Sequence, residues 1–301
     1  MYRMPTLKRR IKSWGFTPFV AISLVILLMP LFVFSFWPIV EGFILSFFRG
    51  SSVLRPVDEF VKLRNYKDML SDRIFRTAIV NTFKFSLMVL PMNILLSLPI
   101  ALGLNTITRF REALRSAYFL PAVTSVVAVS IVWIYLYNPH VGLINTVVEV
   151  LGLMPQAWLS DPKWALFSIA VMWVWRDLGY NVVVFLAGLQ GIPTYFYEAA
   201  RIDGANGFQL FRYITVPLLR PVMQFVVIMT AISSFKVFDP IQVMTSGGPM
   251  RATTNLVFYV YEHAFEYLKM NQAAAASVVL FGIILLITLL QLFHFRTQWE
   301  Y

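Results

Sequence analysis

The most regular feature of the chain is an alternation of long apolar runs with short polar stretches. A helix needs about 20 mostly apolar residues to cross the roughly 30 Å hydrocarbon core of a bilayer. Helices suit lipid because they satisfy their own backbone hydrogen bonds. Six segments are long enough: 17–40, 79–104, 117–137, 164–189, 218–236 and 273–295. The pattern predicts an all-α integral membrane protein with six transmembrane helices.

The first apolar run has to be distinguished from a signal peptide, because the basic tail 1–16 precedes it. A signal peptide has an apolar region of only about 7–15 residues and a small-residue cleavage site. The run from Thr17 to Val40 has 24 uncharged residues and no such site. We therefore expect it to be retained as the first helix, so that residues 17–301 form one transmembrane domain behind an N-terminal tail.

The composition agrees with a membrane environment and excludes several kinds of site. Hydrophobic residues make up 58% of the chain and charged residues only 13%, whereas a soluble domain carries roughly 25% charged residues. There is no cysteine, and His140, His263 and His294 lie far apart without metal-ligand spacing. We expect neither a metal nor a cofactor in this chain. The net charge of +10 is scattered between apolar runs, which argues against a nucleic-acid partner.

The orientation in the membrane is only weakly encoded. Cytoplasmic segments of membrane proteins carry an excess of Lys and Arg. With the N-terminus inside, the inner segments hold 12 such residues and the outer segments 11. The tail 1–16 favours this orientation, because it has five basic residues and no acidic one beside the first helix. We therefore expect both termini in the cytoplasm of a bacterial or archaeal cell, whose inner membrane the chain crosses several times.

The predicted outer loops contain two recognisable local structures. Residues 58–76 alternate charged side chains with apolar ones, which is typical of an amphipathic helix on a membrane surface. Residues 246–249 read Ser-Gly-Gly-Pro. This composition indicates a sharp turn, since glycine permits unusual backbone angles and proline fixes φ.

The predicted inner loop 190–217 contains a helix–turn–helix pattern. Pro193 and Thr194 favour a helix start, residues 195–203 provide about two turns, and Gly204 with Gly207 ends them. A second short helix is then expected to stop at Pro217. Alanines on the first helix permit close approach by another protein. The residues alone leave two interpretations open, a contact surface for a partner or a helix that only connects two spans.

The same loop resembles a known family motif. Glu198-Ala199-Ala200, followed by Gly204 and then by Ile214 and Pro217, resembles the EAA loop of ABC importer permeases. Val216 stands where the family prefers leucine, which is a conservative departure. The flanking segments 187–193 and 203–205 are similar to the carbohydrate-uptake branch, which includes maltose and glycerol-phosphate permeases.

The resemblance extends from about residue 60 to residue 293. Residues 142–145 are similar to the second outer loop of that branch, and 246–265 to the last one, of the larger-subunit type. Residues 60–66 resemble the first outer loop, although Lys62 replaces a common glycine. The resemblance implies the type I ABC importer permease fold.

The resemblance also implies the partners and the mechanism. The EAA residues Glu198, Ala199, Ala200, Asp203, Gly204 and Ala205 would contact a cytoplasmic ATPase. Two ATPase subunits, which bind ATP and Mg²⁺, would drive the transport cycle, since this chain has no phosphate-binding loop with Lys and Ser or Thr. An extracellular or periplasmic solute-binding protein would deliver the substrate. A second permease subunit would complete a heterodimer within the lipid bilayer.

Polar residues inside the predicted helices are candidates for substrate contact, because such residues are costly in lipid. The resemblance places sugar contacts in the fourth and fifth helices, at positions that match Tyr180, Asn181, Thr230 and Ser234. We add Arg176 and Asp177, which lie near the middle of the fourth helix. Neighbouring helix residues point about 100° apart and pair poorly, so Arg176 is expected to face a cavity or an acidic group of the partner permease. A cavity-facing arginine would suit an acidic sugar.

Two alternatives remain at the level of sequence. One is an ABC permease for a solute other than a sugar, against which the Gly-Gly-Pro outer loop argues. The other is a polytopic membrane enzyme, which would need clustered carboxylates or histidines at one membrane face. Glu198 and Asp203 are the nearest candidates, but no histidine or metal partner accompanies them. We therefore predict a transport subunit rather than an enzyme.

Overall fold

The computed structural model describes residues 18–52, 55–107 and 111–294, and it is almost entirely helical. Among the described residues, four helices are long and apolar enough to cross a membrane, and there are up to six spans if each of two bent pairs counts as one. This agrees with the six predicted segments. The N-terminal tail 1–16 lies outside the described residues.

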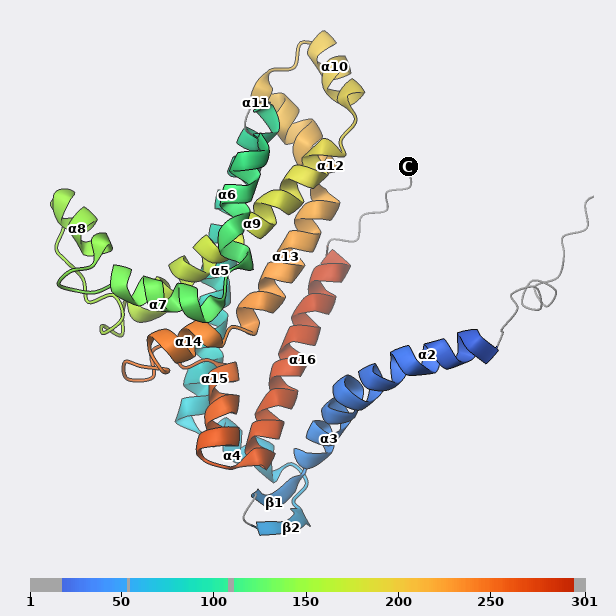
Figure 1. The fold of residues 1–301 in the computed structure, drawn as a ribbon, viewed down its shortest axis with the longest axis vertical. Helices are drawn as coiled ribbons and strands as arrows, with labels where there is room; N and C mark the ends of the chain where they lie inside the picture. The colour runs from blue at the N-terminus through green and yellow to red at the C-terminus, as the bar shows by residue number, and fades with distance from the viewer. Residues whose placement is uncertain (1–17, 53–54, 108–110, 295–301) are drawn as a thin grey trace, which may run out of the picture.

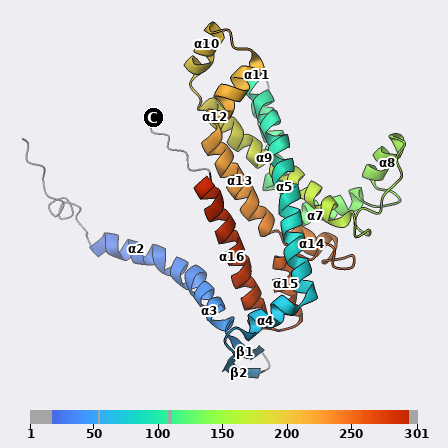
Figure 2. The same cartoon turned by 180° about the vertical axis from the view of Figure 1, so that it is seen from behind.

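The first span is an arm that leaves the rest of the bundle. It consists of α2 (Pro18–Leu31), a π-helical turn (Phe32–Phe36) and α3 (Trp37–Leu45). Both views show α2 diverging from the other helices (Figures 1 and 2). Within the most apolar window of this span, no residue is buried. Only the α3 end packs on the bundle, against α16 (Met270–His294).

The first outer segment differs from its prediction. A hairpin of β1 (Phe48–Ser52) and β2 (Arg55–Phe60) precedes the short α4 (Arg64–Ser71). Only α4 matches the amphipathic helix that we expected over 58–76. The hairpin arises because Phe48 and Phe60 pair across the strands with ring centroids 5.4 Å apart. Helix α4 then ends, and Asp72 is the non-helical residue between it and the next helix.

The long α5 (Arg73–Thr106) starts directly after Asp72 and forms the second span. The Asp72 carboxylate caps it by accepting a hydrogen bond from the Ile74 amide at 2.9 Å. The helix packs along α9 (Ala165–Gln190), which is the fourth span and the best buried of the candidate spans. These two helices form the centre of the molecule.

The third predicted span is not one straight helix. It consists of α6 (Arg111–Val123) and α7 (Val126–Leu136), which meet at 96°. Pro121 has no amide hydrogen to donate, and the Thr124 hydroxyl bonds the Pro121 carbonyl at 2.6 Å. The helical ladder therefore ends, and Ser125 is extended. The short α8 (Leu143–Val150) follows in the second outer loop (Figure 1).

The inner loop leads into a second bent pair. After α10 (Thr194–Ile202), the helix runs through α11 (Gly207–Leu210), a π-helical turn (Phe211–Thr215) and α12 (Val216–Leu218). It then bends by 66° into α13 (Arg220–Phe235).

Our prediction that the second short helix stops at Pro217 was wrong. The Val216 amide bonds the Phe211 carbonyl, so the backbone hydrogen bonds have already changed from the α-helical to the wider π-helical spacing before Pro217. The helix therefore continues to Leu218. The break falls at Leu219, because Pro221 cannot donate to the turn before it.

The last outer loop contains α14 (Asp239–Met244), α15 (Leu256–Tyr261) and a π-helical turn (Glu262–Glu266) before α16. The predicted turn at 246–249 is present, with the Gly248 amide bonded to the Thr245 carbonyl at 2.9 Å. Gly247 has φ +78°, and a Cβ there would collide with the Phe258 ring. This loop and the β-hairpin lie at the end of the molecule opposite α10 (Figures 1 and 2).

Candidate functional site

The inner loop projects α10 from one end of the molecule as a well-defined helix. Pro193 precedes the helix, and Asp203 ends it. Gly204 then takes φ +85°, and the Ala205 amide bonds the Ala200 carbonyl at 2.9 Å, which closes the end in the usual manner of a left-handed cap. Asn206 and Gln209 form a reciprocal capping box that starts α11.

The six predicted coupling residues lie on the surface of this projection. Glu198, Ala199, Asp203 and Gly204 are exposed, and the two other alanines are partly exposed. Between α10 and the following helix is a shallow hollow of about 270 Å³. It is lined by Ala200, Asp203, Gly204, Ala205, Gln209, Tyr213 and Ile214.

Three large side chains are exposed on the same projection, and our sequence prediction did not include them among the contacts. Ile202 is 87% exposed, Phe208 73% and Tyr213 72%. Exposed apolar groups gathered at one tip are typical of a protein contact. The sequence did contain an indication of this contact surface, namely the apolar residues that flank Gly204 in an otherwise polar loop.

The projection is anchored to the base of the spans rather than hanging freely. The hydroxyl of Tyr197 lies 3.1 Å from that of Thr215. Tyr197 also packs against a buried apolar cluster that includes Leu189, Ile192 and Leu219. These contacts connect α10 to the bend at Leu219 and to the end of α9.

A buried polar cluster joins the three central helices α5, α9 and α13. The Asn181 amide donates to Asn93 Oδ1 at 2.7 Å and to Thr230 Oγ1 at 3.2 Å. The Ser234 hydroxyl donates to Ser86 Oγ at 2.7 Å. All five side chains are buried. The predicted substrate contacts Asn181, Thr230 and Ser234 are therefore engaged in helix packing in this conformation, and no open surface reaches them.

The α5 members of this cluster were missed by the sequence prediction. The sequence could have indicated them, because three polar residues interrupt the apolar run of α5 and polar residues within a span are costly in lipid: Ser86, Asn93 and Ser97. The Asn93 amide nitrogen and the Ser97 hydroxyl are buried without a hydrogen-bond partner in the described part of the chain. An unsatisfied buried polar group costs about 1–3 kcal/mol. The cluster thus retains unused hydrogen-bonding capacity.

Arg176 and Asp177 do approach each other, contrary to our expectation for adjacent residues. Their Nη1 and Oδ1 atoms are 3.7 Å apart. The long arginine side chain can bend back toward its neighbour, and its guanidinium also lies over the Trp173 ring, 5.4 Å from the centroid. A further long contact of 3.4 Å reaches the Ala122 carbonyl on α6. Arg176 thus uses Nη1 and Nη2 within the chain, while its buried Nε has no hydrogen-bond partner among the described residues.

Two residues that follow Asp177 on α9 differ in their surroundings, since one is exposed and the other is packed against α6. Tyr180 is 39% exposed and remains available to a ligand or a partner. At Gly179 a Cβ would collide with the Tyr118 carbonyl oxygen of α6. Gly179 therefore allows the two helices to cross closely.

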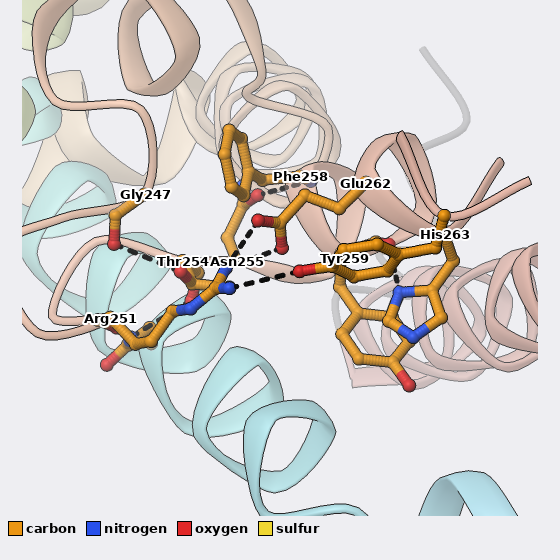
Figure 3. A network of polar contacts seen from close by, with 10 residues as sticks. Gly247, Arg251, Thr254, Asn255, Phe258, Tyr259, Glu262 and His263 are labelled. Carbon is orange, nitrogen blue, oxygen red and sulfur yellow. Dashed lines mark hydrogen bonds and ion pairs between the residues drawn. The ribbon is translucent and has the colours of Figure 1, made fainter. Parts of the chain in front are cut away.

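A second polar network holds the last outer loop (Figure 3). Both carboxylate oxygens of Glu262 accept from Arg251 Nη1, at 2.5 and 2.6 Å. His263 stacks on Tyr259 with ring centroids 3.8 Å apart. The Tyr259 hydroxyl donates to Asp72 Oδ2 at 2.9 Å, which ties the loop to the start of α5.

The environment of this network shifts three pKa values. The hydrogen bonds that Arg251 donates to the Glu262 carboxylate raise the pKa of Arg251. Burial raises the pKa of Tyr259 and lowers that of His263 below the usual 6.5. At neutral pH the network therefore holds a protonated Arg251 beside a neutral histidine.

Buried contacts from α5 complete the attachment of this loop. The Asn81 amide donates to the Arg251 and Thr254 carbonyls, both at 3.0 Å. The Thr82 hydroxyl accepts from the Leu256 amide at 3.0 Å. The sequence analysis predicted none of these contacts, because they join residues 170 to 174 positions apart.

Comparison with known proteins gives consistent results. The family described as "binding-protein-dependent transport system inner membrane component" matches residues 93–297. A probable ABC transporter permease protein of Pyrococcus horikoshii is 34% identical over 94% of this chain and 96% of its own length. The trehalose/maltose transport system permease protein of Thermococcus litoralis is 36% identical over 88% of this chain and 90% of its own.

Among solved structures, the fold is similar to a chain of a bacterial ABC transporter involved in the import of the acidic polysaccharide alginate. The TM-score is 0.83 at 21% identity, covering 97% of this chain and 100% of that one.

Proposed function

Because the chain belongs to the family of inner membrane components of binding-protein-dependent transport systems, we propose that it is the permease subunit of an ATP-driven importer of sugars or oligosaccharides. The observation that carries the coupling part of this proposal is the exposed, firmly anchored helix α10. A helix that presents Ile202 with 87% exposure at one end of a membrane protein is suited to docking on another protein.

The docking partner that we propose is a cytoplasmic ATPase, with two copies serving the complex. ATP and Mg²⁺ would bind there, and closure of the ATPases would pull on α10. The anchoring of Tyr197 to Thr215 would pass this movement to the bend at Leu219. The exposed Glu198 and Asp203 would provide fixed charges, and the alanines Ala199, Ala200 and Ala205 would allow close approach.

A second permease subunit, forming a heterodimer with this chain, is also part of the proposal. The apolar window of the first span has no buried residue. A groove of about 700 Å³ lies between α3 and α16 and is lined by Phe43, Val278 and Phe281 among others. Lipid could cover either surface, but a helix of a partner subunit would also fill the groove and would hold the arm in place.

The sugar specificity rests on the names of relatives and on the chemistry of the central cluster. The relative from Thermococcus litoralis is named as a trehalose/maltose permease. Asn181, Thr230 and Ser234 carry amide and hydroxyl groups, which pair well with sugar hydroxyls. If the central helices part during transport, these groups and the unused Asn93 and Ser97 donors would become available. A non-sugar solute remains the alternative.

The proposed orientation places both termini and α10 in the cytoplasm. The β-hairpin and the last outer loop would then face outward, where a solute-binding protein delivers substrate. The Arg251–Glu262 network would give that protein a firm docking surface.

The test of the coupling assignment compares two exposed apolar residues at opposite ends of the molecule. Ile202→Asp should reduce copurification of the ATPase at least tenfold, because a charge in an apolar contact costs more than about 1.4 kcal/mol. Met250→Asp is the matched control, since Met250 is 90% exposed on the last outer loop. It should leave ATPase copurification unchanged.

Two results would contradict the proposal. Normal ATPase association with the Ile202→Asp permease would rule out α10 as the coupling helix. Failure of the complete reconstituted complex to take up any saccharide from its binding protein would reject the substrate class.

A further inference from the structure

The outer half of α5 carries a line of cations on one exposed face. Arg73, Arg76 and Lys84 are all exposed and, with Thr77, Val80 and Asn81, line one open hollow of about 430 Å³. Positions three, four, seven and eleven residues apart fall on the same side of a helix. The opposite face of α5 is buried against the bundle.

These cations are not used to stabilise the fold. Among the side chains that the structure describes, none gives Arg73, Arg76 or Lys84 an acidic partner, whereas Arg64, Arg176 and Arg251 each have one. Within the described ranges, the Arg76 guanidinium donates to the Ser71 carbonyl at 3.2 Å and makes no other polar contact. The nearby Asp72 carboxylate is engaged by Tyr259 and the Ile74 amide.

The line extends too far along the helix to match one layer of lipid headgroups. Lys84 lies 11 positions after Arg73, about 16 Å further at a rise of 1.5 Å per residue. The polar layer of one leaflet is only roughly 5–8 Å thick. Arg73 and Lys84 therefore reach different depths, and a lysine facing lipid chains would be costly.

The hollow also adjoins the firmly held last outer loop. Asn81 lines it and bonds the Arg251 and Thr254 carbonyls. A solute released at the outer surface would meet Arg73 and Arg76 first and Lys84 deeper in the span. Arginine binds carboxylate and phosphate with paired hydrogen bonds, and lysine adds a point charge.

We propose that this face of α5 is the outer part of the translocation path and that Arg73, Arg76 and Lys84 recognise an anionic saccharide, one that carries carboxylate or phosphate groups. The inference rests on the proposed sugar-import function and narrows its substrate class. It replaces Arg176 as the basis for an acidic substrate, since Arg176 is occupied by Asp177, Trp173 and the Ala122 carbonyl.

The test uses the complete complex with its binding protein, reconstituted in vesicles of neutral phosphatidylcholine. Uptake is measured for a panel of neutral trisaccharides and a panel of trisaccharides that contain uronic acid. Arg76→Gln and Lys84→Gln should each lower uptake of the acidic panel about tenfold, the loss expected for one hydrogen bond between charged groups. Lys84→Arg should retain uptake. Lys67→Gln, an exposed cation on α4, is the matched control and should have no effect.

The outcomes separate this inference from the function on which it rests. Uptake of neutral but not acidic saccharides by the wild-type complex would overturn the inference and leave the importer assignment intact. Uptake of neither panel would reject the importer assignment itself. Equal losses on both panels for Arg76→Gln and Lys84→Gln, or a loss that appears only in vesicles with anionic lipid, would assign the cations to assembly or to lipid and would also overturn the inference.

Discussion

At the scale of single residues, the last outer loop depends on a few side chains whose protonation states matter. His263 is buried, stacks on Tyr259, and donates from Nδ1 to the Tyr259 carbonyl at 2.9 Å. Burial lowers the pKa of His263 below 6.5, and Lys269 adds to this effect, whereas the hydrogen bond to the Tyr259 carbonyl and the carboxylates of Asp72 and Glu262 act against it. The neutral imidazole is thus the form that fits the folded loop.

This environment predicts a loss of stability in mild acid. Since the folded protein binds a proton on His263 less readily than the unfolded chain, the stabilisation is complete above pH 6.5 and declines as the pH falls below that value. The slope contributed by one group is at most about 1.4 kcal/mol per pH unit. We expect the melting temperature of the purified permease to fall between pH 7.5 and 5.5, and the fall to be smaller for His263→Gln.

The control for this prediction is the exposed His140. His140→Gln should melt with the same pH dependence as the wild type. If His263→Gln also keeps the full dependence, the sensitivity to acid arises elsewhere in the protein.

At the scale of elements, α10, the proposed coupling helix, ends in a conformation that favours glycine. Gly204 has φ +85°, while a Cβ at this position would meet no atom within 4 Å. A side chain would therefore affect the backbone alone, at a cost of about 1–2 kcal/mol for the left-handed conformation. Such a cost is too small to unfold a membrane protein, but it is sufficient to distort the tip of α10.

We therefore expect Gly204→Val to impair coupling without loss of folded protein. Transport and ATPase association should fall severalfold, while the amount of permease in the membrane stays normal. Gly207→Val is a matched variant, since Gly207 is exposed, has open space around it and does not have a positive φ. Equal transport by the two variants would show that the shape of the turn at Gly204 is unimportant.

At the scale of the whole molecule, the two ends of the protein present different structural elements. One end presents α10, and the other presents the β-hairpin and the tightly bonded last outer loop (Figure 2). A transport cycle that is driven from one side and supplied from the other needs this separation. The near-equal counts of basic residues leave the orientation open to experiment.

Reporter fusions test this orientation directly. A fusion after Thr194 should report the cytoplasm and one after Gly248 the outside, because Thr194 begins α10 whereas Gly248 lies in the last outer loop, between α14 and α15 and on the other side of the span formed by α13. Activity of an alkaline phosphatase and fluorescence of a cytoplasmic reporter give opposite readouts at each site. Reversed signals would place α10 where no ATPase can reach it and would refute the proposed mechanism.

Much of this architecture was determined by local sequence. Runs of apolar residues specify membrane spans because lipid leaves a backbone no other means of satisfying its hydrogen bonds. The helix at 194–202 and the turn at Gly204 were predicted within a residue, because proline and glycine act through their own backbone angles. The coupling motif is equally local, since all of its residues lie in one loop.

Only the tertiary structure decided which polar residues remain available. Asn181, Thr230 and Ser234 are polar in sequence, yet Asn181 and Ser234 bond to Asn93 and Ser86 on α5, 88 and 148 positions away, and Thr230 accepts from Asn181. The bend between α6 and α7, the strand pairing at Phe48 and the occupation of Arg176 likewise depend on neighbours. A residue's type sets what it can bind, but its partners depend on how the helices pack, and that packing is a property of the whole chain.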